Sequence, residues 1–246
     1  MSLGAATAES RQAALLQEGL DGLALRATEP QRAALLGYLG LLQKWNRAYN
    51  LSAVRDPQLM VSHHLLDCLA IIPALDRYLG AAAGARILDV GSGAGLPGVV
   101  LAVMRPNWMV CCVDAVAKKA SFVRQVAAEL GLQNLRAEHG RVQALRLPAF
   151  DVVVSRALAS LADFASWSRG RLAPGGVWLA MKGRLPEEEI AALPASVSVF
   201  HVEQLQVPGL DAKRCLVWMR PAQAVSSPIK TGDQPAPAGS GPPKLG

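Results

Sequence analysis

Three alternating glycines, Gly91, Gly93 and Gly95, follow an apolar segment and precede a predicted helix. Glycine at every second position lets the chain turn tightly and brings backbone N–H groups against a ligand, where a side chain would block the approach. A second apolar segment, 110–113, ends in Asp114, whose carboxylate can accept hydrogen bonds from both hydroxyls of a ribose. These residue types in this order predict a site for a nucleotide-like cofactor.

The loop fits two classes of cofactor, and the acid before it favours one of them. Gly93-x-Gly95-x-x-Gly98 matches the dinucleotide fingerprint, in which an acid follows about 20 residues later, so a nicotinamide-dependent oxidoreductase is one interpretation. The pattern apolar-apolar-Asp-x-Gly-x-Gly-x-Gly also resembles class I methyltransferases, whose cofactor, S-adenosyl-L-methionine, is cationic and has no phosphate. Carboxylates at Asp89 and Asp114 suit such a cation, whereas a pyrophosphate is disfavoured beside negative charge. We therefore favour a methyltransferase.

The elements that must position this loop alternate between strands and helices from residue 85 onward. Strands are predicted at 86–90, 108–114, 135–139, 150–155, 176–181, 197–205 and 214–219, and helices from 96 and at 117–130, 160–171 and 186–193. The alternation predicts an α/β fold, a Rossmann-like doubly wound sheet of the class I methyltransferase type, mostly parallel. The last two strands predict an antiparallel hairpin at one edge. In such a sheet the ligand binds beyond the carboxyl ends of the strands.

Four regions are predicted along the chain. Residues 1–10 are small and polar and are expected to be disordered. Residues 11–84 are expected to form a helical region, with helices at 11–25, after a capping box that starts at Thr28, and at 57–78. Residues 85–221 form the cofactor-binding domain, and the proline- and glycine-rich residues 222–246 form a disordered tail.

The composition indicates a soluble globular protein of the cytoplasm. Of its 246 residues 51% are apolar, and no apolar run approaches the ~18 residues of a membrane helix. The N-terminus lacks a basic segment before a long apolar core, so no export signal is expected. The four cysteines form no Cys-x-x-Cys pair and lie in apolar segments, which predicts buried free thiols and no metal site.

The net charge of +6 is concentrated in the predicted cofactor-binding domain, where 16 Lys and Arg face 11 Asp and Glu between residues 85 and 221. An excess of cations around a cofactor site suits a polyanionic substrate such as RNA. From charge alone, a solvated surface remains the simpler interpretation.

Further motifs follow one another along the chain: Asn50-Leu51-Ser52-Ala53, His63-His64-Leu65-Leu66-Asp67, the loop at 89–98, Val113-Asp114-Ala115 followed by Lys118-Lys119, Ser155-Arg156-Ala157, and Met181-Lys182-Gly183. Together, over roughly residues 12–220 and in this order, they resemble the RsmG (GidB) family of bacterial small-subunit ribosomal RNA guanine-N7 methyltransferases. The resemblance implies methylation of a guanine N7 in small-subunit ribosomal RNA, with that RNA or the small ribosomal subunit as partner. We expect a monomer.

The resemblance also implies which residues contact the cofactor. Val142 and Gln143 stand where relatives commonly carry Ala-Glu, so their contact depends on whether backbone or side chain binds the adenine edge. Together with the two acids and glycines of the loop pattern, the predicted cofactor-binding residues are Asp89, Gly91, Gly93, Leu96, Asp114, Ala115, Val116, Val142, Gln143 and Arg156.

Guanine N7 has an in-plane lone pair and no proton, so its methylation needs alignment and neither a general base nor a covalent adduct. The position after the fourth strand is Ser155-Arg156-Ala157, where enzymes that methylate exocyclic amines carry Asn/Asp-Pro-Pro-aromatic, and no cysteine that could attack a cytosine lies nearby. We assign no catalytic residue. Arg156 could bind the methionine carboxylate or the O6 edge of guanine.

The predicted RNA contacts are cations near the cleft rim, with Lys182 the strongest candidate: Lys182, Lys118, Lys119, Arg124 and Arg184. Tyr49, Trp45 or Phe122 could support an unstacked base, although core packing is the simpler role for each. His63 and His64 fit either an RNA role or a polar patch between the helical region and the sheet. A ribosome-assembly factor that binds RNA through a methyltransferase fold remains the alternative from outside the enzymes.

Overall fold

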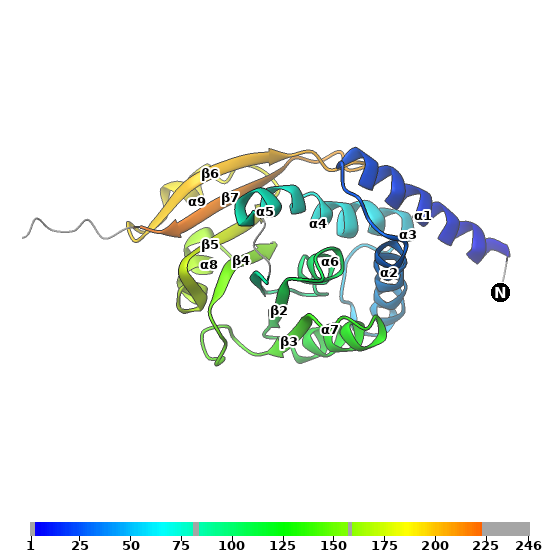
Figure 1. Cartoon of the computed structure of the whole chain (residues 1–246), viewed down its shortest axis with the longest axis horizontal. Helices are drawn as coiled ribbons and strands as arrows, with labels where there is room; N and C mark the ends of the chain where they lie inside the picture. Colours follow the sequence, from blue (N-terminus) through cyan, green and yellow to red (C-terminus); the bar gives the residue numbers. More distant parts are fainter. Residues whose placement is uncertain (1–2, 81–83, 157–158, 223–246) are drawn as a thin grey trace, which may run out of the picture.

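A seven-stranded sheet forms the centre of the computed structural model, which describes residues 3–80, 84–156 and 159–222. The strand order is β3-β2-β1-β4-β5-β7-β6. The first five strands are parallel, whereas β7 is antiparallel to both β5 and β6 (Figure 1). The bounds are β1 Arg86–Val90, β2 Met109–Asp114, β3 Leu135–His139, β4 Phe150–Arg156, β5 Leu172–Lys182, β6 Val197–Leu205 and β7 Arg214–Pro221. The predicted doubly wound sheet with an antiparallel edge hairpin is confirmed.

Helices cover both faces of this sheet (Figure 1). One face carries α6 (Gly98–Met104) and α7 (Ala117–Glu129), together with α1 (Leu3–Gly22) and α2 (Glu29–Tyr49). The other carries α8 (Leu161–Ser168), the 3₁₀ turn η2 (Arg169–Arg171) and α9 (Glu187–Ala191). Buried leucines of α1 and α2 share one apolar core with α6 and α7, so these two N-terminal helices pack directly on the helices that cover the sheet.

The stretch from Pro57 to Leu79 is continuous but not uniformly α-helical. It comprises α3 (Pro57–Met60), the π-helical segment η1 (Val61–Leu66), α4 (Asp67–Leu69) and α5 (Ile72–Leu79). The sequence predicts one ordinary helix here, because a single π turn leaves the apolar periodicity almost unchanged. By length and composition this stretch could cross a membrane, whereas the sequence analysis expects no such segment. However, 78% of its most apolar window is buried inside the fold, as in the core helix of a globular protein.

Two boundary predictions at the N-terminus are wrong. Residues 3–10, expected to be disordered, belong to α1, because the alanine-rich run there favours a helix. Helix α1 also ends at Gly22, three residues before the predicted Leu25. The tail 223–246 lies outside the described residues, so its predicted disorder stays a prediction.

The cysteine prediction is confirmed, since Cys68, Cys111, Cys112 and Cys215 are free and buried. Within the described residues no group of three His, Cys, Asp or Glu side chains could hold a metal ion.

Candidate functional site

The glycine loop follows β1 and turns through three positive φ angles, 69° at Gly91, 58° at Gly93 and 87° at Gly95. L-residues rarely adopt these angles, which explains glycine at each position. Two contacts fix the loop in place: Gly91 N donates to Val113 O at 2.8 Å, and the Tyr38 hydroxyl on α2 donates to Ala94 O at 2.9 Å. Helix α2 therefore helps to position the loop, which motif spacing did not indicate.

Asp89 lies behind the loop and lines neither of the two cavities described below. It is fully buried, and its Oδ2 accepts a hydrogen bond from Gly98 N at 2.9 Å. Its Oδ1 has no partner among the described residues. In the structure Asp89 holds the start of α6 against the end of β1, and the predicted contact between this carboxylate and the cofactor stays a prediction.

Burial raises the pKa of Asp89 to about 7, although the Gly98 N–H and the charge of Arg156 oppose this rise. In the unfolded chain the carboxyl ionises near pH 4, so between about pH 4 and 7 the folded protein retains a proton that the unfolded chain has released. This group therefore lowers the stability as the pH rises through that window.

We expect Asp89→Asn, which retains an oxygen for the Gly98 N–H, to remove this pH dependence. Relative to the variant, the wild type should lose about 3 kcal/mol in free energy of unfolding between pH 5 and pH 8. Urea unfolding of both proteins at the two pH values measures the difference, and other titrating groups cancel in the comparison. Equal changes in both proteins would show that Asp89 titrates normally.

Asp114, at the end of β2, is nearly buried and faces the glycine loop. Its Oδ2 accepts from Gly93 N at 2.9 Å and its Oδ1 from Val116 N at 2.8 Å, while the Lys119 ammonium lies 4.0 Å from Oδ2. These contacts fix the position of the carboxylate between the glycine loop and the start of α7. Each oxygen keeps a lone pair with which it can accept a ligand hydroxyl.

A cavity of about 360 Å³ opens beside Asp114 at the carboxyl ends of β1, β2 and β3. Four predicted cofactor residues line it, namely Gly91, Ala115, Val142 and Gln143. Val116 is exposed beside it and contributes its backbone N–H to Asp114. Trp167 of α8 also lines the cavity. The sequence does not indicate this role, because an aromatic residue on a helix is usually part of the core.

A second cavity, of about 540 Å³, also includes Gly91 in its lining and is bounded by the segment 51–54, η1 and α4. The two cavities share Gly91, so they are adjacent parts of one cleft. Chain segments far apart in sequence meet at the second cavity: Leu51–Val54, His63, His64, Asp67, Gly91–Ala94, Leu96, Arg156, Met181–Gly183 and Arg214.

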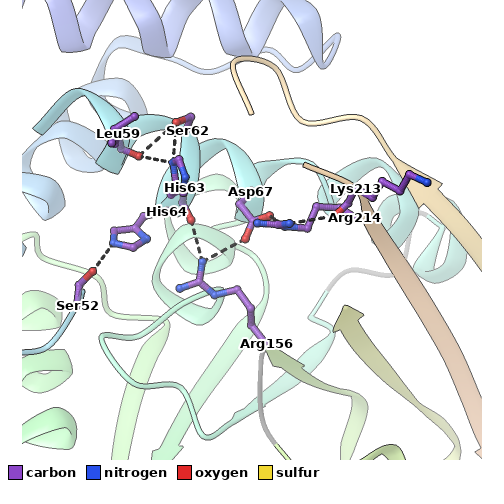
Figure 2. Close-up of polar contacts among 9 residues, drawn as sticks. All are labelled: Ser52, Leu59, Ser62, His63, His64, Asp67, Arg156, Lys213 and Arg214. Atoms are coloured by element: carbon purple, nitrogen blue, oxygen red, sulfur yellow. Dashed lines mark hydrogen bonds and ion pairs between the residues drawn. The ribbon is translucent and has the colours of Figure 1, made fainter. Parts of the chain in front are cut away.

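Arg156 enters the second cavity from the end of β4 and binds η1 and α4 (Figure 2). Its Nη1 donates to His63 O at 3.0 Å and to Asp67 Oδ2 at 3.2 Å. Arg214 of β7 donates from Nε to the other oxygen, Asp67 Oδ1, at 2.7 Å. Asp67 thus bridges two arginines, and Arg214 was missed because only the edge hairpin brings it to this position.

His64 also lies on η1 and points toward Ser52 (Figure 2). Its Nε2 is hydrogen-bonded to Ser52 Oγ over 2.7 Å, and Asn46 holds the Ser52 backbone with two hydrogen bonds of 2.9 Å. Burial and the nearby Arg156 charge lower the pKa of His64 to about 4. The ring is therefore neutral near pH 7, and the geometry gives it a structural role in fixing the segment 51–54.

The predicted RNA-binding cations differ in the contacts that they already make within the protein. Lys182 is bound to Glu189 at 2.8 Å, and Arg184 lies in the loop before α9, whose first residues Glu187, Glu188 and Glu189 line the same pocket. Arg124 donates from Nε to the Ala137 carbonyl at 3.0 Å. Lys118 is exposed at the start of α7, and the half-buried Lys119 lies beside Asp114.

The family model and the similar sequences that match most of this chain carry the same description. The family model described as GidB, rRNA small subunit methyltransferase G, matches residues 31–217. A protein of Acidovorax sp. (strain JS42) named Ribosomal RNA small subunit methyltransferase G is 60% identical over 84% of this chain and 94% of its own. A protein of the same name from Leptothrix cholodnii is 57% identical over 86% of this chain and 97% of its own.

Two solved structures resemble the fold at low sequence identity. TrmN from Thermus thermophilus covers 65% of this chain and 53% of its own, with a TM-score of 0.50 and 21% identity. MtNAS in complex with MTA and tNA covers 84% of this chain and 81% of its own, with a TM-score of 0.52 and 16% identity. At these identities the likeness concerns the fold alone.

Proposed function

Because this chain belongs to the GidB family, rRNA small subunit methyltransferase G, we propose that it transfers a methyl group from S-adenosylmethionine to N7 of a guanine in small-subunit ribosomal RNA. One observation supports this assignment most strongly. The cleft has two adjacent lobes that meet at Gly91, one beside Asp114, the type of acid that binds a ribose, and one between the strand ends and the segments 51–54, η1 and α4.

The first lobe fits the adenosine part of the cofactor. Its volume of about 360 Å³ lies in the range of small-molecule sites. Asp114 does not itself line this cavity, but its chain neighbours Val113 and Ala115 do, and its carboxylate is the proposed acceptor for the ribose hydroxyls. Gly91 brings bare backbone to the ligand, and Val142 and Trp167 provide apolar walls. When bound, S-adenosylmethionine supplies a methyl group activated by the positive sulfonium.

The second lobe fits the methionine end and the target base. Arg156 uses Nη1 to bind His63 and Asp67, so its other donors remain for a carboxylate or for guanine O6. The rigid anchoring of Arg156 by Asp67 suits a reaction in which alignment of nucleophile and methyl group supplies ~7–11 kcal/mol of the barrier reduction. Guanine N7 loses no proton on methylation, so these residues need to orient and bind, without acting as a base.

The dinucleotide interpretation and the non-catalytic assembly factor lose support from the family match and the near-full coverage of relatives named methyltransferases. We further propose that the protein acts as a monomer in the cytoplasm, where its ribosomal RNA or small-subunit substrate is found.

The position of methylation can be tested in ribosomal RNA. N7-methylation places a positive charge on guanine and makes the ring labile, so borohydride and aniline cleave the RNA there. RNA from a deletion strain should lose one small-subunit cleavage, which returns with the wild-type gene. A gene encoding Gly93→Asp, which adds a carboxylate next to Asp114, should fail to restore it. If every cleavage persists in the deletion strain while another methylated nucleoside disappears, the N7 assignment is wrong.

A further inference from the structure

An exposed aromatic ring lies at the end of α2, next to the second lobe. Tyr49 is 44% exposed, and its ring centroid lies 5.2 Å from that of Trp45, one helical turn earlier. Trp45 in turn lies 5.4 Å from Phe122, which is fully buried on α7. Tyr49 is therefore backed by two further rings, tilted by 36° at Trp45 and 58° at Phe122, and the innermost ring lies in the core while Tyr49 remains accessible.

This ring is directly connected to the cleft. The segment Leu51–Val54 begins two residues after Tyr49 and lines the second lobe. Asn46, on the same helix, holds Ser52 with two backbone hydrogen bonds, and His64 binds the Ser52 hydroxyl. The position of Tyr49 relative to the lobe is thus fixed by short-range contacts.

Two exposed cations lie on chain segments that adjoin these three rings, Lys118 on α7 and Arg55 after α2. Lys118 is exposed and precedes Phe122 by one turn of α7, which places both residues on the same face of that helix. Arg55 is exposed and donates to the Asn50 side chain at 2.8 Å. Neither has an ion pair within the described part of the chain.

The rim near Lys182 and Arg184, on the other side of the second lobe, carries carboxylates next to its cations. There Lys182 is paired with Glu189, and Arg184 lines one pocket with the three glutamates that begin α9. A phosphate backbone is attracted to uncompensated cations and repelled by carboxylates. Charge therefore favours approach of RNA over the ends of α2 and α7.

We propose that small-subunit RNA crosses this α2–α7 rim, with one unpaired base stacked on Tyr49 and phosphates bound by Lys118 and Arg55. The proposal rests on the proposed function and specifies the RNA-binding surface of the same site. Aromatic rings bind splayed bases through stacking, and lysine and arginine position the backbone. Tyr49 then holds the strand at the mouth of the lobe in which the guanine is methylated.

Binding of the full chain to a small-subunit ribosomal RNA transcript, measured by fluorescence anisotropy over a range of KCl concentrations, tests the proposal. Tyr49→Ala should weaken binding about 5- to 150-fold, and Tyr49→Phe, which keeps the ring, should restore it. Combined Lys118→Gln and Arg55→Gln should reduce the slope of log affinity against log salt by about 1.4. Arg26→Gln serves as the matched control, because it removes an exposed cation near the opposite end of the same helix, about 30 Å away.

S-adenosylmethionine binding, measured by calorimetry on the same variants, separates the two proposals. It should be unchanged in all of them, and its absence from the wild type would overturn the proposed function rather than the rim. The wild type could bind both cofactor and RNA while the Tyr49 and Lys118/Arg55 variants keep the same RNA affinity and salt slope. That result would overturn the proposal that RNA binds at the α2–α7 rim. A loss confined to Arg184→Gln would place the RNA on the opposite side of the cleft.

Discussion

Replacing Gly98 by alanine is expected to lower the free energy of unfolding by about 2–3 kcal/mol and to slow methyl transfer about 100-fold. A Cβ at this position would overlap the Cys112 sulfur and lie 3.0 Å from Asp89 Oδ2. These neighbours belong to central strands and cannot move apart easily. The start of α6 must therefore shift and break the Gly98 N–H bond to Asp89, which displaces the whole glycine loop. Urea unfolding and steady-state methylation measure the two effects.

Two matched variants distinguish this steric cause from a general sensitivity of the loop. Gly93→Ala adds a Cβ that meets nothing within 4 Å and should cost only about 1–2 kcal/mol, through the positive φ of residue 93. Cys112→Ala removes the overlapping sulfur, so the double variant Gly98→Ala/Cys112→Ala should recover much of the stability lost by Gly98→Ala alone. Simple addition of the two single effects would contradict the overlap.

The part of the site that the sequence predicts well is local. The glycines, Asp114 and the pair Val142-Gln143 follow strands directly, and the carboxyl ends of parallel strands meet at one edge of the sheet. Once the strands are recognised from their apolar runs, the position of these residues follows. The first lobe is made mostly of such residues, which explains why it could be predicted.

The second lobe could be predicted only in part, because tertiary packing builds it. Arg214 reaches Asp67 across 147 positions, through an edge hairpin whose register no spacing in the sequence specifies. The ion pair between Lys182, a predicted RNA contact, and Glu189 could not be predicted either. Glu189 lies in the short helix α9, and no spacing in the sequence indicates that this helix reaches the end of β5. The hydrogen bond from Gly98 N to Asp89 likewise could not be predicted, because the sequence does not reveal which side of the loop the carboxylate faces.

Asp114→Ala is expected to weaken S-adenosylmethionine binding by about 1–3 kcal/mol, roughly 5- to 150-fold, while the fold is retained. The change removes the acceptors for the ribose hydroxyls and also frees Gly93 N and Val116 N, which now fix the cavity wall. Asp114→Asn keeps one side-chain oxygen but no charge, so its loss should be smaller. Isothermal titration calorimetry gives the affinities.

A carboxylate at the opposite end of the sheet provides the control for this prediction. Asp151, near the start of β4, also accepts a backbone hydrogen bond, from Arg86 N at 2.7 Å, but lies at the amino ends of the strands. Asp151→Asn should therefore alter stability slightly and leave cofactor affinity unchanged, because ligands bind at the carboxyl ends. If Asp114→Ala bound S-adenosylmethionine as tightly as the wild type, Asp114 would be a support for the loop alone. The ribose would then have to be bound by other groups in the first lobe.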